Sequence, residues 1–385
     1  MTILSEHRPA PGRHRPVTKA QLALRFDYVL LLSTLFVAAL GALMVYSATR
    51  DNLALAGDDP RYYLKRQATF VVVGALVMGV VALLDYHWLE HASAVIYAVV
   101  ILGLLSMFVI GSSPELGATR WLQLPGGIQV QPSAFATLGM VIVVATYCSR
   151  RPNGITFTDL LKILALVAVP IVLVAKQPDL GSAIVMSVVL LVMLTVAGIP
   201  GRYLVLLLAL VAIGVVGIIH LHLLKPYQVQ RLAGFIDQKG KLTQVTYTYG
   251  QSESAIAKGG FWGTGLFHGA QTNLSYVPEQ KTDFIFSAVG EQLGFVGSAI
   301  VLALLGLVSW RVLRSAQVAR DSFGRLLCAG IFTLLAFSIF ENAGMSMGIM
   351  PIAGIPLPFF SYGGSAIIAF FAAVGVALSV NLRRR

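Results

Sequence analysis

The sequence predicts an all-α polytopic membrane protein with about ten transmembrane helices, and three observations support this prediction. Hydrophobic residues make up 57% of the 385 residues and charged residues only 12%, with a mean hydropathy of +0.79. Apolar runs of roughly membrane-spanning length recur along the chain, and many basic residues lie in the short links between them. This composition excludes both an ordinary soluble domain and a disordered polymer.

Ten apolar runs define the expected spans. They cover residues 28–46, 68–84, 93–111, 134–148, 160–175, 182–199, 203–224, 292–310, 326–345 and 364–380. A helix needs ~20 residues, or ~17 at the short end, to cross the hydrocarbon core. The runs at 134–148 and 160–175 are shorter, so both are expected to extend into their flanks. Residues 1–26 are predicted to form a cytoplasmic basic arm, and 27–385 a single membrane domain.

The distribution of Lys and Arg predicts the orientation of the chain. With ten spans both termini share one side, and 15 basic residues in the arm, the tail and the short links lie there, against six opposite. Because basic residues favour cytoplasmic links, both termini are predicted to be cytoplasmic. Residues 225–284 then form a large extracytoplasmic loop between spans 7 and 8. Its recurring aromatic residues favour short helices that cover the outer face of the bundle.

Several other classes of function find no support in the sequence. The net charge of +11 does not indicate nucleic-acid binding, because the basic residues do not gather on one face. The sequence has no phosphate-binding GxxxxGK[ST] loop, no dinucleotide fingerprint and no Ser/His/Asp arrangement, so no nucleotide cofactor is expected. Cys148 and Cys328 lie at run ends on the predicted cytoplasmic side and do not indicate a disulfide.

Asp283 is the leading candidate for chemistry. It lies with Glu279, Lys281 and Glu291 around the start of the eighth apolar run. Charged groups at the mouth of a membrane helix are costly to desolvate, so they usually line a wet cavity. A carboxylate there can accept a proton from a hydroxyl group, and Lys281 can lower its pKa or meet a phosphate. The alternative is that Thr282 or Asp283 simply caps the helix.

Other polar residues of the predicted outer segments are further candidates. Asp179 follows a proline that ends one helix, and it either caps the next helix or binds a ligand or metal. Arg120 could hold a phosphate bidentately, whereas the neighbouring Trp121 is better explained as an aromatic anchor at the interface. Arg231, in the long loop, is a weaker candidate of the same kind, with a solvated surface charge as the alternative.

The segment 350–365 is not expected to be a continuous helix, because it holds three prolines and three glycines. It is either a surface turn or a segment that dips to membrane depth. Broken backbone survives at that depth only where protein or water satisfies its polar groups. In the second case the segment would line the cavity, with Gly363 and Gly364 allowing close approach of a head group. Glu341 and Asn342, in the ninth run, are expected to support it.

These outer segments together resemble the SEDS (shape, elongation, division and sporulation) family, the polytopic glycan polymerases of bacterial cell-wall synthesis. The matching segments are Ala118-Thr119-Arg120-Trp121, Val130-Gln131-Pro132-Ser133, Gln177-Pro178-Asp179-Leu180-Gly181, Val277-Pro278-Glu279-Gln280-Lys281-Thr282-Asp283-Phe284, Leu357-Pro358-Phe359 and Ser361-Tyr362-Gly363-Gly364-Ser365. The ten-span topology agrees with this family. The wording Gly354-Ile355-Pro356-Leu357-Pro358 resembles the elongation (rod-shape) branch more than the division branch.

The resemblance implies polymerisation of lipid II, in which a sugar hydroxyl displaces undecaprenyl diphosphate from an anomeric carbon with inversion. Asp283 matches the family's essential aspartate and would be the general base, or would organise the acceptor and a divalent cation such as Mg²⁺ or Mn²⁺. Positive groups or the metal would offset the charge that develops on the diphosphate. The substrate-binding residues implied are Arg120, Trp121, Gln131, Ser133, Asp179, Arg231, Glu279, Lys281, Ser361 and Gly363.

The same resemblance implies the location and the partners. The expected location is the bacterial cytoplasmic membrane. The expected partners are lipid II, the glycan linked to undecaprenyl diphosphate, and a class B penicillin-binding protein that crosslinks the new strand. No nucleic acid is expected.

Three positions depart from the family pattern. Ala134 and Thr137 stand where the family usually has a glutamate and a lysine, and Lys281 stands where it usually has a histidine. Losing an acid and a base together suggests a lost ion pair, with Lys281 as a hypothetical replacement cation. Two other functions stay open: a flippase for a lipid-linked precursor, since a wet polar cavity could carry a head group, and a noncatalytic scaffold for the penicillin-binding protein.

Overall fold

The computed structural model describes residues 26–110, 121–124, 128–151, 154–220, 226–238 and 243–384. Within these residues ten apolar helices follow the ten predicted runs, which confirms the polytopic helical class. Seven are long and apolar enough to cross a membrane: α2 (Tyr28–Ala56), α3 (Tyr62–Leu83), α6 (Pro132–Ser149), α7 (Phe157–Lys176), α13 (Ile285–Val318), α14 (Ser322–Ser346) and α15 (Gly364–Leu382). Three have shorter apolar stretches: α5 (Ser93–Ile110), α8 (Leu180–Val196) and α9 (Gly201–His220).

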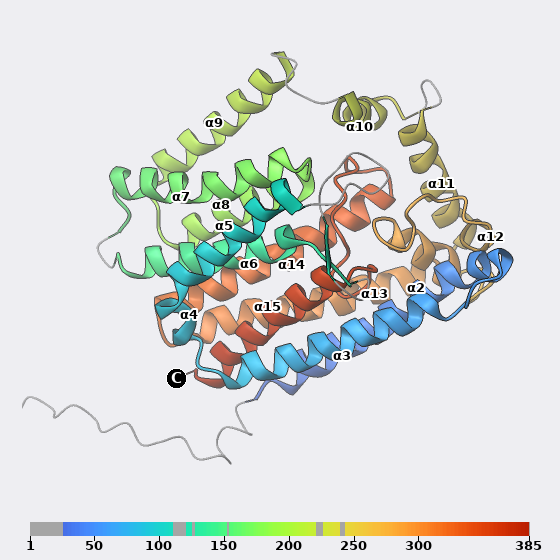
Figure 1. The fold of residues 1–385 in the computed structure, drawn as a ribbon, viewed down its shortest axis with the longest axis horizontal. Coiled ribbons are helices and arrows are strands. Elements are labelled where there is room, and N and C mark those ends of the chain that lie inside the picture. Colours follow the sequence, from blue (N-terminus) through green and yellow to red (C-terminus); the bar gives the residue numbers. More distant parts are fainter. Residues whose placement is uncertain are drawn as a thin grey trace, which may run out of the picture.

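The long helices pack side by side into one bundle (Figure 1), with α15 along α3, and α13 along both α2 and α14. Small residues permit the closest of these approaches, as is usual where apolar helices cross in a membrane. A Cβ atom at Gly74 of α3 would lie 2.4 Å from the fully buried ring of Phe371 in α15. As predicted, α6 and α7 extend beyond their apolar runs into the flanking residues.

Polar contacts close one end of the bundle, which we call the termini face. Asp27, the N-cap of α2, is buried and forms an ion pair of 2.7 Å with Arg311 near the end of α13. Asp321, the N-cap of α14, accepts hydrogen bonds from Tyr86 and the backbone of Gly324. The short helix α4 (His87–His91) lies at this end. Both the first and the last spanning helix therefore have their terminal ends on the same face.

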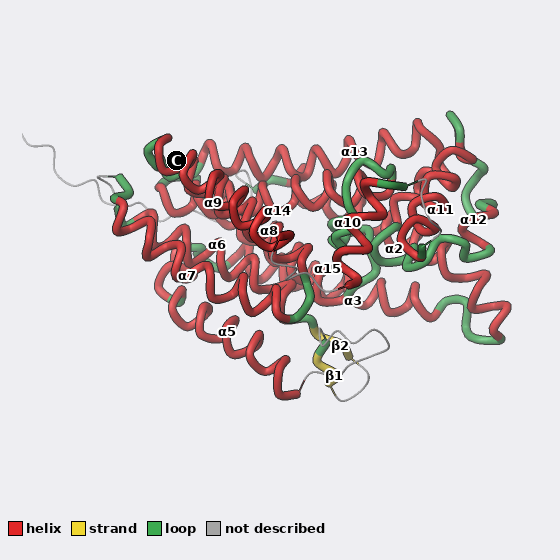
Figure 2. The backbone as a smooth tube through the Cα atoms, turned by 90° about the horizontal axis from the view of Figure 1, so that it is seen from above, coloured by secondary structure: helices red, strands yellow, loops and turns green. Residues whose placement is uncertain are grey.

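Short elements cover the opposite end, which we call the loop face. The described part of the predicted long loop contains three helices, α10 (Pro226–Ile236), α11 (Gln244–Gly259) and α12 (Ala270–Asn273), of which α11 packs on α13 and α12 on α2. A two-stranded antiparallel hairpin, β1 (Leu122–Leu124) and β2 (Ile128–Val130), stands at the edge of the bundle (Figure 2). The sequence interpretation included the helices and missed the hairpin.

Helix α13 is broken at Gly294, whose φ of +65° and ψ of −165° are not helical. Residues 260–265 fill the break. The backbone N–H groups of Thr264 and Gly265 donate to the carbonyls of Glu291 and Gln292, and those of Phe295 and Val296 donate to Gly260 and Phe261. The broken backbone of a membrane helix is thus satisfied by protein, as a lipid environment requires.

Residues 347–363 between α14 and α15 are non-helical, as predicted. They are not a surface turn, because Phe359 and Phe360 are fully buried among the helices. Helix α2 runs so close to this segment that a Cβ atom at Gly41 would lie 2.5 Å from the carbonyl oxygen of Phe359. Phe359 itself has a φ of +67°, an unfavourable conformation for a bulky residue. Tight packing therefore carries this segment, which we call the entry loop, into the bundle.

Candidate active site

Asp283 lies at the loop face, directly before α13. Three successive backbone N–H groups, those of Thr282, Asp283 and Phe284, donate to the carbonyl of Glu279. Glu279 has a φ of +50°, which allows this tight turn. Phe284 occupies the N-cap position and has no side-chain capping bond, while the Thr282 hydroxyl bonds back to Glu279. Neither Thr282 nor Asp283 therefore occupies the N-cap position of α13.

The half-buried Asp283 carboxylate lies over Gly354 of the entry loop. A Cβ atom at Gly354 would lie 3.4 Å from Asp283 Oδ2 and 3.9 Å from Arg231 Nη1, so both side chains end beside the same glycine. Arg231 reaches the site from α10, and its Nη1 donates to the carbonyl of Ile352 at 3.2 Å. Gly354 has a φ of +71°, which favours glycine. Asp283 and Arg231 were both predicted as site residues, and the structure brings them together although they are 52 positions apart in the sequence.

Two adjacent residues of helix α14, Glu341 and Asn342, lie beside the site. The Asn342 amide nitrogen donates to the backbone carbonyl of Asp283 at 2.7 Å and to that of Ile355 at 2.8 Å. It therefore fixes the turn at residues 279–284 and the entry loop to one helix. Glu341 is only 2% exposed, and its carboxyl group is close enough to Asp283 and Arg231 to interact electrostatically with both. Sequence reasoning gave Glu341 and Asn342 only a supporting role.

Asp179 forms a separate, hydrogen-bonded cluster. It is buried, it is the N-cap of α8, and its Oδ1 accepts the backbone N–H of Ser182 at 3.2 Å. Its Oδ2 accepts from the hydroxyls of Ser133 and Ser182, both at 2.8 Å, and from the Gln131 amide at 3.3 Å. Four donors leave this carboxylate well satisfied, which supports the capping role. The cluster adjoins the entry loop because Gly181 packs against the backbone of Ala353.

Lys281 points toward α3. Its ammonium lies 4.5 Å from the centre of the Tyr63 ring and donates to the Tyr63 hydroxyl at 3.2 Å. Tyr362 contacts the same ring edge to face, and its backbone N–H donates to the Lys281 carbonyl at 2.8 Å. Lys281 thus pairs with an aromatic side chain of α3, whereas Thr137, the position whose lost cation it was expected to replace, is buried in α6.

The remaining predicted residues have mixed environments. Glu279 is exposed, and Gly363 is the half-buried N-cap of α15. Ser361 is buried, and its hydroxyl accepts the backbone N–H of Leu357, which ties the entry loop to itself. Trp121 is half-buried at the start of the hairpin. Arg120 and residues 1–25 of the predicted basic arm lie outside the described residues.

Glu291, part of the polar cluster that singled out Asp283, has a structural role. It is fully buried and accepts the backbone N–H groups of Gln271 and Thr272 and the Thr272 hydroxyl, at 2.6 to 2.9 Å. It therefore caps α12 and fastens the long loop to α13. Next to it, Gln292 accepts from the Ser47 hydroxyl at 2.6 Å.

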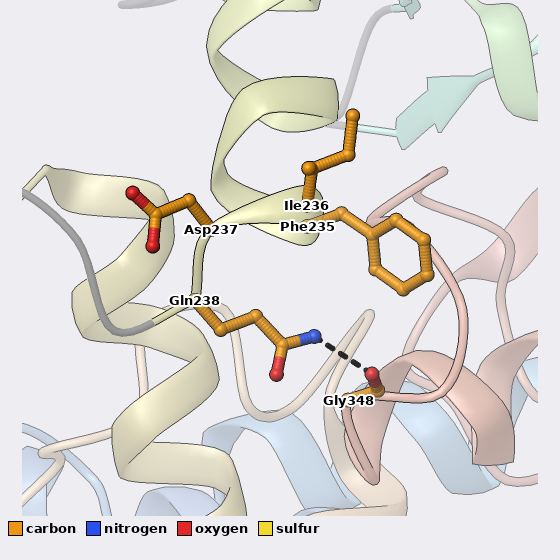
Figure 3. Close-up of a pocket in the computed structure, with 5 residues that line it drawn as sticks. All are labelled: Phe235, Ile236, Asp237, Gln238 and Gly348. Carbon is orange, nitrogen blue, oxygen red and sulfur yellow. Dashed lines mark hydrogen bonds between the residues drawn. The ribbon is translucent and has the colours of Figure 1, made fainter.

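An open hollow of about 380 Å³ lies at the end of α10 (Figure 3). Phe235, Ile236, Asp237, Gln238 and Gly348 line it, and the Gln238 amide donates to the Gly348 carbonyl at 2.8 Å. This contact joins the helix that carries Arg231 to the start of the entry loop. The hollow holds a single carboxylate and no basic side chain, which gives it little chemistry of its own.

The fold and the site define a polytopic membrane protein with a carboxylate and a guanidinium group held over a glycine at one end of its helical bundle. Residues 28–385 match the family model described as cell cycle protein, which covers FtsW, RodA and SpoVE. The chain therefore belongs to the FtsW/RodA/SpoVE family, and the predicted SEDS membership is confirmed.

Relatives from two named groups match almost the whole chain. A probable peptidoglycan glycosyltransferase FtsW of Geobacter sp. (strain M18) is 36% identical over 364 residues, covering 94% of this chain and 98% of the relative. The peptidoglycan glycosyltransferase MrdB of Escherichia coli K12 is 34% identical over 361 residues, covering 93% and 94%. Both names state the class of enzyme that the sequence predicted.

Solved structures share the fold. A chain of a peptidoglycan synthase complex, described as coordinating polymerization and crosslinking, matches with a TM-score of 0.77 and 29% identity over 92% of this chain and 97% of that one. The rod shape determining protein RodA of Thermus thermophilus matches with a TM-score of 0.68 and 28% identity over 93% and 97%. The predicted fold class is confirmed by both.

Proposed function

We propose that this chain is a peptidoglycan glycosyltransferase that polymerises lipid II into glycan strands during cell elongation, with Asp283 as the general base. The observation that carries the proposal is the position of Asp283 beside Arg231 over Gly354, at the loop face of the helical bundle. Membership in a family whose relatives are named peptidoglycan glycosyltransferases supports the reaction class.

The geometry supports one displacement step. The hydroxyl group of the acceptor sugar gives its proton to the Asp283 carboxylate while its oxygen bonds to the anomeric carbon of the donor. The bond from that carbon to the diphosphate oxygen breaks, and the electron pair leaves with the undecaprenyl diphosphate. Attack opposite the leaving group inverts the anomeric centre. Arg231, beside Asp283, offsets negative charge on the leaving diphosphate as a fixed cation can.

The residues at the site also fit a divalent cation, Mg²⁺ or Mn²⁺. No group of three His, Cys, Asp or Glu side chains that could hold a metal occurs within the described ranges. Magnesium, however, commonly binds through one or two carboxylates together with substrate phosphates. Asp283 and the buried Glu341 offer two such carboxylates. When bound there, the ion would supply positive charge to the diphosphate.

The proposed orientation places the termini face in the cytoplasm and the loop face outside. The excess of Lys and Arg on the side of the termini supports it, because basic links favour the cytoplasm. Asp283 lies at the other end of α13 from Arg311, so the site would meet the lipid-linked sugar in the outer leaflet. The sequence of the segment Gly354-Ile355-Pro356-Leu357-Pro358 supports a place in the elongation branch of the family.

We also propose a class B penicillin-binding protein as the partner. The similarity to a chain of a peptidoglycan synthase complex that coordinates polymerization and crosslinking supports this pairing. Co-purification of the full chain with such a protein, and loss of the complex on deleting the long loop helices, would test it.

Polymerisation of labelled lipid II by the purified chain tests the function. The wild type and the control variant Asp237→Asn, which changes an exposed carboxylate at the end of α10, are expected to form glycan strands. Asp283→Asn keeps the shape of the side chain and removes the base, so strands are expected to disappear. Translocation of head groups in liposomes without polymer would instead identify a flippase. Absence of both activities would identify a noncatalytic scaffold.

A further inference from the structure

Glu341 is the least satisfied charged residue of the described structure. It lies in α14, one turn from the end of the helix, with 2% of its surface exposed. Neither of its carboxyl oxygens has a hydrogen-bond partner among the described residues, although the backbone N–H of Ala353 is close enough to interact. A buried carboxylate without partners costs several kcal/mol, so such a group normally meets a cation, a proton or water.

The guanidinium group of Arg231 is close enough to interact electrostatically with Glu341 but does not satisfy its oxygens. Its Nη1 donates to the carbonyl of Ile352, and no hydrogen bond joins it to Glu341. The buried carboxylates elsewhere in the described structure contrast with Glu341. Asp179 accepts four hydrogen bonds and Glu291 accepts three. The missing partners at Glu341 are therefore specific to the side chain that interacts with Asp283.

The charges around Asp283 point to the kind of partner that is missing. With both carboxylates ionised, as binding of a cation requires, Asp283 and Glu341 carry two negative charges and Arg231 carries one positive charge, so the three groups sum to one negative charge. This sum repels a diphosphate, which the proposed substrate must bring to the site. One divalent cation reverses the sign to one positive charge, and the inference therefore rests on the proposed function. Carboxylate oxygens are the ligands that Mg²⁺ and Mn²⁺ favour.

We propose that Glu341 is a ligand, shared with Asp283, for a divalent cation whose coordination the diphosphate of the lipid-linked sugar completes. Two carboxylates alone make a weak site for such an ion, and phosphate oxygens normally supply the remaining ligands. The ion and the diphosphate therefore bind cooperatively, each increasing the affinity for the other by the same factor. Loss of Glu341 removes both effects.

Binding of Mn²⁺ to the purified full chain, followed by electron paramagnetic resonance, tests this site without relying on turnover. Titrations are made with and without undecaprenyl diphosphate. Undecaprenyl diphosphate is expected to tighten Mn²⁺ binding to the wild type at least tenfold, and Glu341→Gln to abolish that gain. The control Glu253→Gln removes an exposed carboxylate of α11 and is expected to behave as the wild type.

Thermal unfolding gives a second readout that a purely structural role would not produce. A ligand that binds only the folded state raises its stability, so Mn²⁺ with undecaprenyl diphosphate is expected to raise the unfolding temperature of the wild type and not of Glu341→Gln. Without Mn²⁺, Glu341→Gln is expected to unfold at the same or a higher temperature, because it removes an unsatisfied buried charge. If this variant does not fold, Glu341→Asp replaces it, with weakened binding expected.

Equal Mn²⁺ binding by the wild type and Glu341→Gln would overturn the proposal, and so would a site that binds without regard to undecaprenyl diphosphate. If the wild type polymerises lipid II while either result holds, the cation site is wrong and the proposed function stands. If Mn²⁺ binding depends on Glu341 and the wild type forms no polymer, the cation site stands and the polymerase function is wrong.

Discussion

Replacing Gly354 with alanine tests whether the space between Asp283 and Arg231 is where the chemistry occurs. The new methyl group would lie 3.4 Å from Asp283 Oδ2 and 3.9 Å from Arg231 Nη1. A hydroxyl group must come within ~2.6–3.2 Å of its general base, and the methyl group would occupy part of that approach. Since general base catalysis contributes ~10²–10⁴-fold, we expect the rate of polymerisation to fall by roughly 10- to 100-fold.

The same substitution also costs stability, and a matched variant separates the two effects. Alanine at a positive φ costs ~1–2 kcal/mol. Gly348, in the same loop, has the same φ of +71°, and its nearest neighbour would be the flexible end of the exposed Glu253 side chain. Gly348→Ala is therefore expected to lower the unfolding temperature about as much as Gly354→Ala and to polymerise lipid II at nearly the wild-type rate. Equal rates in the two variants would refute the reasoning.

Three further predictions concern other contacts. Gly263→Ala places a Cβ atom 2.2 Å from a carbonyl of α13 and is expected to cost ~3 kcal/mol or more, whereas Gly57→Ala, at a φ of +79° with no atom within 4 Å, should cost only ~1–2 kcal/mol in thermal unfolding. Asn342→Asp turns a carboxylate toward two carbonyls, so the protein should lose ~2–4 kcal/mol of folding stability and most of its polymerase rate. The control Asn381→Asp, at the termini face, should lower the stability alone. Burial opposes ionisation of Asp321, but its hydrogen-bond donors prevail and hold its pKa below the usual 3.8. Its stabilising effect is therefore complete above about pH 4 and lost as the pH falls through the folded value, and unfolding scans from pH 6 to 3 should show a smaller acid-induced loss in Asp321→Asn.

The helical framework was predictable because hydropathy is a local property of the sequence. Each run of apolar residues predicted a membrane helix, and in the described residues ten apolar helices follow the ten runs, seven of them long and apolar enough to cross a membrane. Asp283 could also be singled out from the sequence, since polar residues cluster where an apolar run begins. In that cluster, however, Glu291 is a structural carboxylate that caps α12, so the pattern that singled out this turn was partly made by a residue with a structural role.

The partners of Asp283 could not be predicted from local patterns. Arg231 comes from a different helix of the long loop, and Glu341 and Asn342 come from within an apolar run that also had to cross the membrane. Their meeting depends on how α10, α14 and the entry loop pack together. The contact of Lys281 with Tyr63 of α3 was unpredictable for the same reason, because nothing in the local sequence places these two residues together.

The break in α13 has a consequence for how this enzyme can change over evolutionary time. Four hydrogen bonds between residues 260–265 and the two halves of the helix join main-chain atoms, and glycines make room for them, while the Thr264 hydroxyl and the stacked rings of Phe261 and Phe295 add side-chain contacts. Amino-acid replacements at the other positions of those segments therefore keep the main-chain bonds. Loop surfaces that meet different partners can therefore diversify among descendants while the segment carrying Asp283 keeps its place.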